Sequence, residues 1–293
     1  MPHRGSREEE VAVFVERMAV EIEGEGEPVL MIHGLGGTSN TFTPVLGAFT
    51  RHRTIRFDLP GSGRSHRVEA PLSLTLFVER ARLVMQRTGI ERVHVVAHSM
   101  GTIIAAHLAA SEPGRVASLA LFGPLLAPPE PARAAIRARA AQAREGDMRP
   151  IADALLRTSV AAETRARRPT AVAFVRESLM RQDPDGYARS CEALAEMVPA
   201  DTSRIDCPTL LVTGDEDVVA PPQAVRMMGE RITGSRVEVL RGCGHWTPVE
   251  KPEECIGLLK RFLLERRPTW RMSSSRTSAS STPPVPSPTR ARS

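Results

Sequence analysis

The stretch Val93-His94-Val95-Val96-Ala97-His98-Ser99-Met100-Gly101 decides the fold of this chain. Its mostly apolar first half predicts a buried strand, and the apolar run at 102–110 predicts a helix directly after it. Ser99 therefore lies at the tip of a sharp strand-to-helix turn. Because Ala97 and Gly101 are small, the two backbones can approach closely, and the turn strains the serine and exposes its hydroxyl.

The pentapeptide at 97–101 matches the nucleophile elbow G-x-S-x-G, with alanine in place of the first glycine. A serine hydroxyl is a weak nucleophile, so it needs a base, and the base needs an orienting carboxylate. In the fold that uses this elbow, the acid and then the histidine follow the serine along the chain. Of the eight histidines only His245 lies beyond His107, on a loop after the strand-like run 236–240. We therefore predict Ser99 as nucleophile and His245 as base.

The orienting acid is expected between these two residues, also after a strand. Residues 208–213 predict that strand, and the turn after it holds Asp215, Glu216 and Asp217. Glu216 is the weakest candidate, because its side chain would point away from its two neighbours. We favour Asp217, partly on the resemblance described below, and Asp215 stays as the alternative.

A glycine-rich loop, His33-Gly34-Leu35-Gly36-Gly37, follows another predicted strand at 29–32. Without side chains in the way, a backbone N–H there can reach a reacting carbonyl oxygen. We predict an oxyanion hole formed by the N–H groups of Leu35 and Met100. The loop has neither the G-x-G-x-x-G spacing nor a Walker Lys-Ser/Thr pair, so its sequence does not favour nucleotide binding.

Predicted strands and helices alternate along most of the chain, beginning with one or two strands at 11–23. This alternation predicts an α/β fold with a mostly parallel sheet covered by helices on both faces. It stops at 124–199, where prolines open a stretch of Ala/Arg/Leu-rich helical patterns, so we expect a helical cap, or lid, over Ser99. The expected core is then 10–123 with 200–265, and the Ser/Pro/Arg-rich tail at 268–293 is expected to be disordered.

Composition argues against several classes of protein. The formal net charge is +5, but residues 266–293 hold six arginines and no carboxylate, so the rest of the chain is close to neutral and nucleic acid is not an expected partner. The four cysteines show no metal-site spacing, and no metal is expected. No hydrophobic signal segment opens the chain, and no apolar run approaches the roughly 18 residues that span a membrane. We expect a cytoplasmic protein without a membrane partner.

Several motifs in order resemble the α/β-hydrolase superfamily over roughly residues 10–265: His33-Gly34, Asp58-Leu59-Pro60-Gly61-Ser62-Gly63-Arg64-Ser65, the elbow, Gly214-Asp215-Glu216-Asp217 and Gly244-His245. Ser-Met-Gly at 99–101 and the segment 185–194 are similar to the 3-oxoadipate enol-lactonase group and its esterase relatives. The resemblance implies an α/β-hydrolase fold with a helical cap. It also implies a serine hydrolase that cleaves a small carboxylic ester or lactone without a cofactor.

The expected substrate pocket brings together residues from the elbow, the glycine-rich loop, the histidine loop and the cap: Gly34, Leu35, His98, Met100, Trp246, Arg133, Arg137 and Arg144. The enol-lactonase resemblance implies an anionic substrate held by at least one cap arginine, and these three arginines are the candidates. Three alternatives stay open: a cofactor-free haloperoxidase or perhydrolase, a C–C bond hydrolase, and a non-catalytic ligand-binding protein. Epoxide hydrolases and haloalkane dehalogenases of this fold would have aspartate at the position of Ser99.

Overall fold

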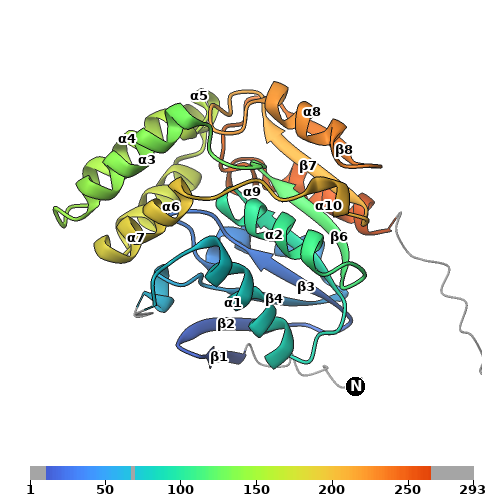
Figure 1. The fold of residues 1–293 in the computed structure, drawn as a ribbon. Coiled ribbons are helices and arrows are strands. Elements are labelled where there is room, and N and C mark those ends of the chain that lie inside the picture. The colour runs from blue at the N-terminus through green and yellow to red at the C-terminus, as the bar shows by residue number, and fades with distance from the viewer. Residues whose placement is uncertain (1–10, 67–69, 265–293) are drawn as a thin grey trace, which may run out of the picture.

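The computed structural model describes residues 11–66 and 70–264, so the predicted basic tail at 268–293 lies outside the described residues. Within these ranges eight strands form one sheet in the order β1-β2-β4-β3-β5-β6-β7-β8 (Figure 1). From β4 to β8 all neighbours are parallel, whereas β1 and β2 pair antiparallel and β2 lies antiparallel to β4. The predicted mostly parallel α/β sheet is confirmed. The strands are β1 Val11–Val15, β2 Met18–Glu23, β3 Glu27–Ile32, β4 His52–Phe57, β5 Val93–His98, β6 Val116–Phe122, β7 Thr209–Gly214 and β8 Arg236–Leu240.

Helices cover both faces of the sheet, as predicted. Successive strand residues point to opposite faces, so Leu30 of β3 packs in the apolar cluster under α1 and α2, and its neighbour Val29 packs in the cluster under α10. The helices of the sheet region are α1 Leu74–Arg87, α2 Met100–Ser111, α8 Pro222–Glu230, α9 Thr247–Glu250 and α10 Pro252–Leu264. The sequence did not predict α8, whose buried side chains are only Val225 and Met228. No described helix is long and apolar enough to cross a bilayer.

A helical insertion, α3 to α7, separates β6 from β7 along the chain. Figure 1 shows these green and yellow helices gathered beside one another at one end of the sheet. Their bounds are α3 Glu130–Ala143, α4 Arg149–Ser159, α5 Ala162–Arg167, α6 Pro169–Met180 and α7 Pro184–Ala195. Side chains of α3, α4 and α7 face the loops that follow β3, β5, β7 and β8 across one cavity.

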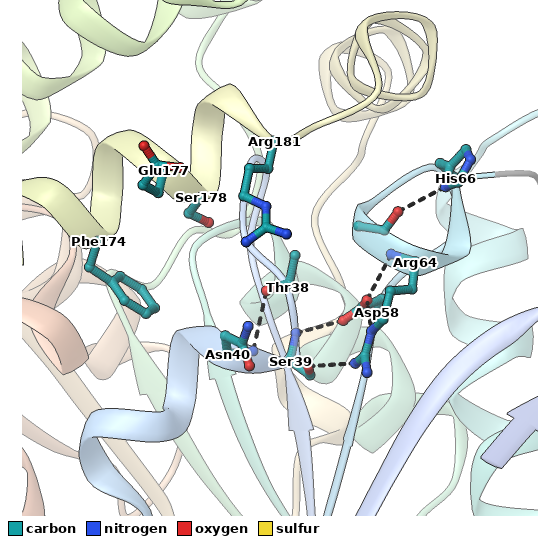
Figure 2. Close-up of a pocket in the computed structure, with 11 residues that line it drawn as sticks. Thr38, Ser39, Asn40, Asp58, Arg64, His66, Phe174, Glu177, Ser178 and Arg181 are labelled. Atoms are coloured by element: carbon teal, nitrogen blue, oxygen red, sulfur yellow. Dashed lines mark hydrogen bonds and ion pairs between the residues drawn. The ribbon is translucent and has the colours of Figure 1, made fainter. Parts of the chain in front are cut away.

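The loop after β4 stabilises the glycine-rich loop after β3 through a buried carboxylate. Asp58 accepts hydrogen bonds from the backbone N–H of Ser39 at 2.8 Å and from the N–H and Nε of Arg64 at 2.9 and 3.0 Å (Figure 2). Burial alone would raise the pKa of Asp58, but Arg64, nearby His33 and these N–H groups hold it below its usual value. Ser39, Asp58 and Arg64 also line a cavity of about 430 Å³, whose other side is formed by Phe174 of α6 and by Arg181 just after this helix. The carboxylate therefore joins two loops at the edge of this cavity.

Asp58→Asn is expected to lower the free energy of unfolding by about 1.5–3 kcal/mol at pH 7, because an amide group would then face donors. The folded carboxyl has the lowered pKa, so its contribution is complete above the unfolded pKa of about 3.9 and is lost as the pH falls through the folded value. The difference between wild type and variant, measured by urea unfolding, should therefore shrink below about pH 4. Asp147→Asn is the control, because Asp147 pairs with Arg149 on the surface and its loss should change stability far less. An equal effect of the two substitutions would contradict the role of Asp58.

Candidate active site

Ser99 lies between β5 and α2 in a backbone conformation that favours glycine, with φ 52° and ψ −124°. The turn holds it there because its N–H donates to the carbonyl of Phe122 at 2.9 Å. A Cβ at Gly101 would lie 2.2 Å from the carbonyl oxygen of Ile32, so no larger residue fits at that position. The strained serine and the close approach of β3 to α2 are the features expected of a nucleophile elbow.

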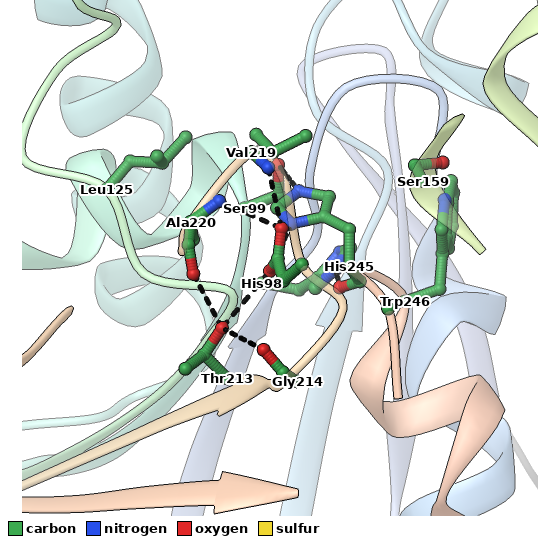
Figure 3. Close-up of polar contacts among 12 residues, drawn as sticks. His98, Ser99, Leu125, Ser159, Thr213, Gly214, Val219, Ala220, His245 and Trp246 are labelled. Carbon is green, nitrogen blue, oxygen red and sulfur yellow. Dashed lines mark hydrogen bonds and ion pairs between the residues drawn. The ribbon is translucent and has the colours of Figure 1, made fainter. Parts of the chain in front are cut away.

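A continuous chain of hydrogen bonds joins Ser99, His245 and Asp217, and Figure 3 shows Ser99 and His245 beside each other. His245 Nε2 lies 2.7 Å from Ser99 Oγ, and its Nδ1 lies 2.8 Å from Asp217 Oδ2. Because an ionised carboxylate only accepts hydrogen bonds, the imidazole proton is on Nδ1, and Nε2 is free to accept the serine proton. This geometry is the one that a serine nucleophile would need from a base and an orienting acid.

Asp217 is 2% exposed and fully hydrogen-bonded. Its Oδ1 accepts from the backbone N–H groups of Val219 and Ala220, each at 2.8 Å, and its Oδ2 also accepts from Thr213 Oγ1 at 3.3 Å. Burial alone would raise the pKa of Asp217, but the adjacent His245 and the two backbone donors hold it below its usual range. The group is therefore ionised at neutral pH.

The two competing acids of the same turn point elsewhere. Asp215 is exposed and accepts a hydrogen bond from the N–H of Cys243 at 3.2 Å. Glu216 is also exposed and accepts from the N–H of Ala162 at 2.9 Å. Of the three candidates, the structure brings only Asp217 to His245.

The glycine-rich loop lies directly against the serine. A Cβ at Gly34 would lie 2.6 Å from Ser99 Cβ, so this residue permits the approach of the loop and does not line the cavity. His33 fixes the loop: its Nε2 accepts from the N–H of Leu59 and its Nδ1 donates to the Gly34 carbonyl, both at 2.8 Å. The two candidate oxyanion donors are the N–H groups of Leu35 and Met100. They lie on two backbone segments that meet at Ser99.

A cavity of about 290 Å³ opens over the serine. Leu35, His98 and Trp246 line it, whereas the Met100 side chain packs in the apolar core. The His98 ring lies 5.2 Å from that of His245 and 5.4 Å from that of Trp246. Its Nε2 donates to the His245 carbonyl at 2.9 Å. Burial, with His245 nearby, lowers the pKa of His98 to about 3, so it is a neutral wall of the cavity.

The three predicted cap arginines do not line this cavity, so the prediction that they lie in the pocket is wrong. Arg133 donates to the carbonyls of Ala195 and Met197. Arg137 pairs with Glu196 at 2.7 Å, and Arg144 Nη2 lies 2.9 Å from Glu192 Oε2. All three are bound to α7 or the segment after it, because they share the face of α3 that packs on α7. The arginine that lines the cavity is Arg139, which the sequence analysis did not single out.

Glu250 is a second residue that the sequence analysis missed. It is 0% exposed, and its oxygens accept from the N–H groups of Ala161 at 2.9 Å and of Gly244 and Trp246 at 3.1 Å each. Burial raises its pKa, against the effect of these donors. The carboxyl group therefore ties the loop of His245 to the segment between α4 and α5. Its position between Val249 and Lys251 gives no sign of burial in the sequence.

No cluster of three or more His, Cys, Asp or Glu side chains with the arrangement of a metal site occurs in the part of the chain that the structure describes. The donors around Ser99 belong to the hydrogen-bond chain itself, and the four cysteines are buried thiols.

Comparisons with known proteins agree with the fold described above. A family model described as the alpha/beta hydrolase fold matches residues 27–252. A 2-hydroxymuconate semialdehyde hydrolase from Pseudomonas putida is 31% identical over 253 residues, covering 83% of this chain and 89% of its own. An (E)-2-((N-methylformamido)methylene)succinate hydrolase from Acinetobacter baylyi is 27% identical over 245 residues, covering 82% and 92%.

The solved structures share the same architecture. An enol-lactonase from Burkholderia xenovorans superposes with a TM-score of 0.79 at 25% identity, covering 84% of this chain and 96% of its own. A thermophilic esterase from Thermogutta terrifontis superposes with a TM-score of 0.80 at 24% identity, covering 85% and 93%. The esterase likeness shows the fold alone.

Proposed function

Because the chain belongs to the alpha/beta hydrolase fold family, we propose that it is a serine hydrolase that cleaves a carboxylic ester or lactone through an acyl-enzyme. The observation that carries the proposal is the hydrogen-bond chain from Ser99 through His245 to Asp217, at 2.7 and 2.8 Å. It lies at the bottom of a cavity with largely apolar walls, which suits a small organic substrate.

In the proposed reaction Ser99 Oγ attacks the acyl carbon while His245 Nε2 takes the hydroxyl proton. Asp217 keeps the imidazole in the reactive tautomer and stabilises the imidazolium that forms. The N–H groups of Leu35 and Met100 bind the oxyanion of the tetrahedral intermediate. His245 then gives its proton to the leaving oxygen. A water molecule, deprotonated by the same nitrogen, releases the acid.

We further propose that the helical insertion α3 to α7 acts as the lid of this site. Its side chains form the outer wall of the cavity, including Ala132, Ile136 and Leu155. A wall made by the insertion determines which lengths and polarities of acyl group fit the cavity, because the core loops supply mainly the reacting groups. Substrate specificity is therefore expected to follow the insertion rather than the sheet.

A C–C bond hydrolase on the same three residues is the second candidate. The relative with 31% identity is named for 2-hydroxymuconate semialdehyde, and another is named for a substituted succinate. Both names denote carboxylates, whereas the enol-lactonase supports the ester or lactone reaction. The three residues alone serve either reaction, so the substrate distinguishes them.

A substrate panel tests the proposal. Purified protein is assayed with p-nitrophenyl esters of increasing chain length, with an enol-lactone and with 2-hydroxymuconate semialdehyde. We expect hydrolysis of short and medium esters or of the lactone, with a sharp loss for acyl chains that exceed a cavity of about 290 Å³. Turnover of the semialdehyde with none of the esters or the lactone would replace the ester proposal by the C–C candidate.

A further inference from the structure

The cavity over Ser99 contains one guanidinium group with no counter-ion. Among the described residues that line it, Arg139 is the only one with a permanent charge, and no aspartate or glutamate lines it. No carboxylate of residues 11–66 and 70–264 forms an ion pair with Arg139, although the helix that carries it forms several. The side chain is half-buried. A cation in such a place lacks an anionic partner in the described protein and part of its hydration.

The helical repeat explains why this arginine differs from the others of α3. Ala132, Ile136 and Arg139 are spaced four and three residues apart, so they lie on one face of the helix, and that face lines the cavity. Arg133 and Arg137 lie on another face, which packs on α7 and provides them with partners. The repeat therefore directs Arg139 alone toward Ser99.

Tyr187 of α7 provides a second observation. Its side chain lines the same cavity and is 1% exposed, and its phenol oxygen forms no hydrogen bond of normal geometry with the described groups, although Arg139 and the Cys191 thiol lie close to it. Burial raises the pKa of this phenol, and the nearby Arg139 guanidinium opposes the rise, so the group is a protonated donor at neutral pH. Buried polar groups are normally paired, so the missing acceptor points to a ligand.

The chemistry of the two groups defines that ligand. Both donate hydrogen bonds, one of them carries a positive charge, and the planar fork of a guanidinium matches a carboxylate. Leu125, Ile136 and Leu155 make the surrounding wall apolar. One fixed positive charge neutralises a carboxylate completely, whereas a phosphate dianion would keep an uncompensated charge in this wall.

We propose that Arg139 and Tyr187 bind a carboxylate of the substrate, so that the enzyme prefers esters or lactones with a second, anionic end. The inference rests on the proposed function of Ser99, since it concerns the substrate of that site. Arg139 and Tyr187 act on specificity and take no part in the bond-making steps.

The experiment compares two substrates of one length, mono-p-nitrophenyl adipate, a monoanion, and its neutral methyl ester, p-nitrophenyl methyl adipate. The wild type should prefer the monoanion in kcat/KM by roughly 10- to 100-fold, the range of a charge-assisted hydrogen bond. Arg139→Gln should remove this preference and leave the neutral ester within about twofold of wild type, and Arg139→Lys should restore part of it. Arg144→Gln is the matched control, because Arg144 follows the same helix but pairs with Glu192 outside the cavity.

Tyr187→Phe supplies a readout that a purely structural role would not give. Removing a hydroxyl that forms no hydrogen bond of normal geometry with the described groups should leave the thermal midpoint unchanged or raised. It should lower kcat/KM for the monoanion by about 3- to 10-fold, the loss of one neutral hydrogen-bond donor, with no effect on the neutral ester.

Binding without turnover separates this inference from the proposed function. Titration calorimetry on Ser99→Ala should detect methyl hydrogen adipate, and Ser99→Ala with Arg139→Gln should bind it at least 10-fold more weakly, as for a lost charged contact. If no ester is hydrolysed but this binding holds, the proposed function fails and the carboxylate site stands. Equal hydrolysis of both esters by wild type, an equal loss on both in Arg139→Gln, or binding that does not depend on Arg139 would each overturn the inference.

Discussion

Ser99→Ala is expected to lower kcat on any hydrolysed ester or lactone by about 10⁴-fold or more, the scale found when a serine nucleophile is removed. The side chain loses one hydroxyl and no packing volume, and its φ of 52° is imposed by the turn. The thermal midpoint should therefore change little. Steady-state kinetics with the best ester of the panel measure the loss of activity, and circular dichroism checks the fold.

Ser159→Ala is the matched control for that variant. Ser159 also lines the cavity, but its hydroxyl donates to the carbonyl of Leu155 at 2.7 Å and forms no hydrogen bond with the imidazole. Its backbone carbonyl, which alanine keeps, accepts from the N–H of His245 at 2.8 Å. We expect a change in kcat of less than about threefold, well under the effect of one oxyanion donor. A loss of activity in Ser159→Ala as large as that in Ser99→Ala would mean that the cavity, rather than the nucleophile, had been damaged.

Asp217→Asn is expected to lower kcat by about 10³- to 10⁴-fold. The amide oxygen would take the place of Oδ1 and accept the hydrogen bonds that the N–H groups of Val219 and Ala220 donate to Oδ1 in the wild type. The amide NH₂ would then face His245 Nδ1 and force the imidazole proton onto Nε2. In that tautomer the histidine has no lone pair for the proton of Ser99.

Asp215→Asn is the control for this prediction, because it lies two residues away in the same turn and is exposed. Within the described part of the chain its carboxylate accepts one hydrogen bond, from the N–H of Cys243. An amide oxygen can keep this bond, so kcat should stay within a few-fold of wild type. Kinetics of the two variants side by side decide the assignment. A larger loss in Asp215→Asn than in Asp217→Asn would move the orienting acid to Asp215.

Much of the fold could be predicted because the buried strands have a recognisable pattern in the sequence. The buried strand β6, Val116–Phe122, is almost entirely apolar. The partly exposed strand β8, Arg236–Leu240, coincides with the strand-like run recognised at 236–240. Helix α8 was missed because only two of its side chains are buried, which gives too short an apolar stripe to predict a helix.

The order of chemical groups along the chain is enough to predict Ser99 as nucleophile and His245 as base. The sequence leaves Asp215 open against Asp217, because both follow β7 and only the path of the turn decides which carboxylate reaches the imidazole. That path depends on backbone donors at Val219 and Ala220, which residue identity does not reveal.

The cap arginines show where sequence reasoning stops. Helix α3 has alanine on most of its sides and Ile136 as its one large apolar residue, so no broad apolar stripe tells which face meets α7 and which meets the cavity. The sequence analysis placed Arg133, Arg137 and Arg144 in the pocket, yet the tertiary packing directs these three to α7 or the segment after it and Arg139 to the cavity. Glu250 was missed for a related reason, since its donors include the N–H of Ala161, far away along the chain.

Peptide mapping after reaction with a fluorophosphonate tests the central claim most directly. The reagent phosphonylates only a serine that a neighbouring base activates and an oxyanion hole supports. The account predicts one adduct per chain, on the peptide that contains Ser99, with no adduct in Ser99→Ala and a strongly slowed reaction in Asp217→Asn. An adduct on another residue, or undiminished ester hydrolysis by a protein fully modified at Ser99, would contradict it.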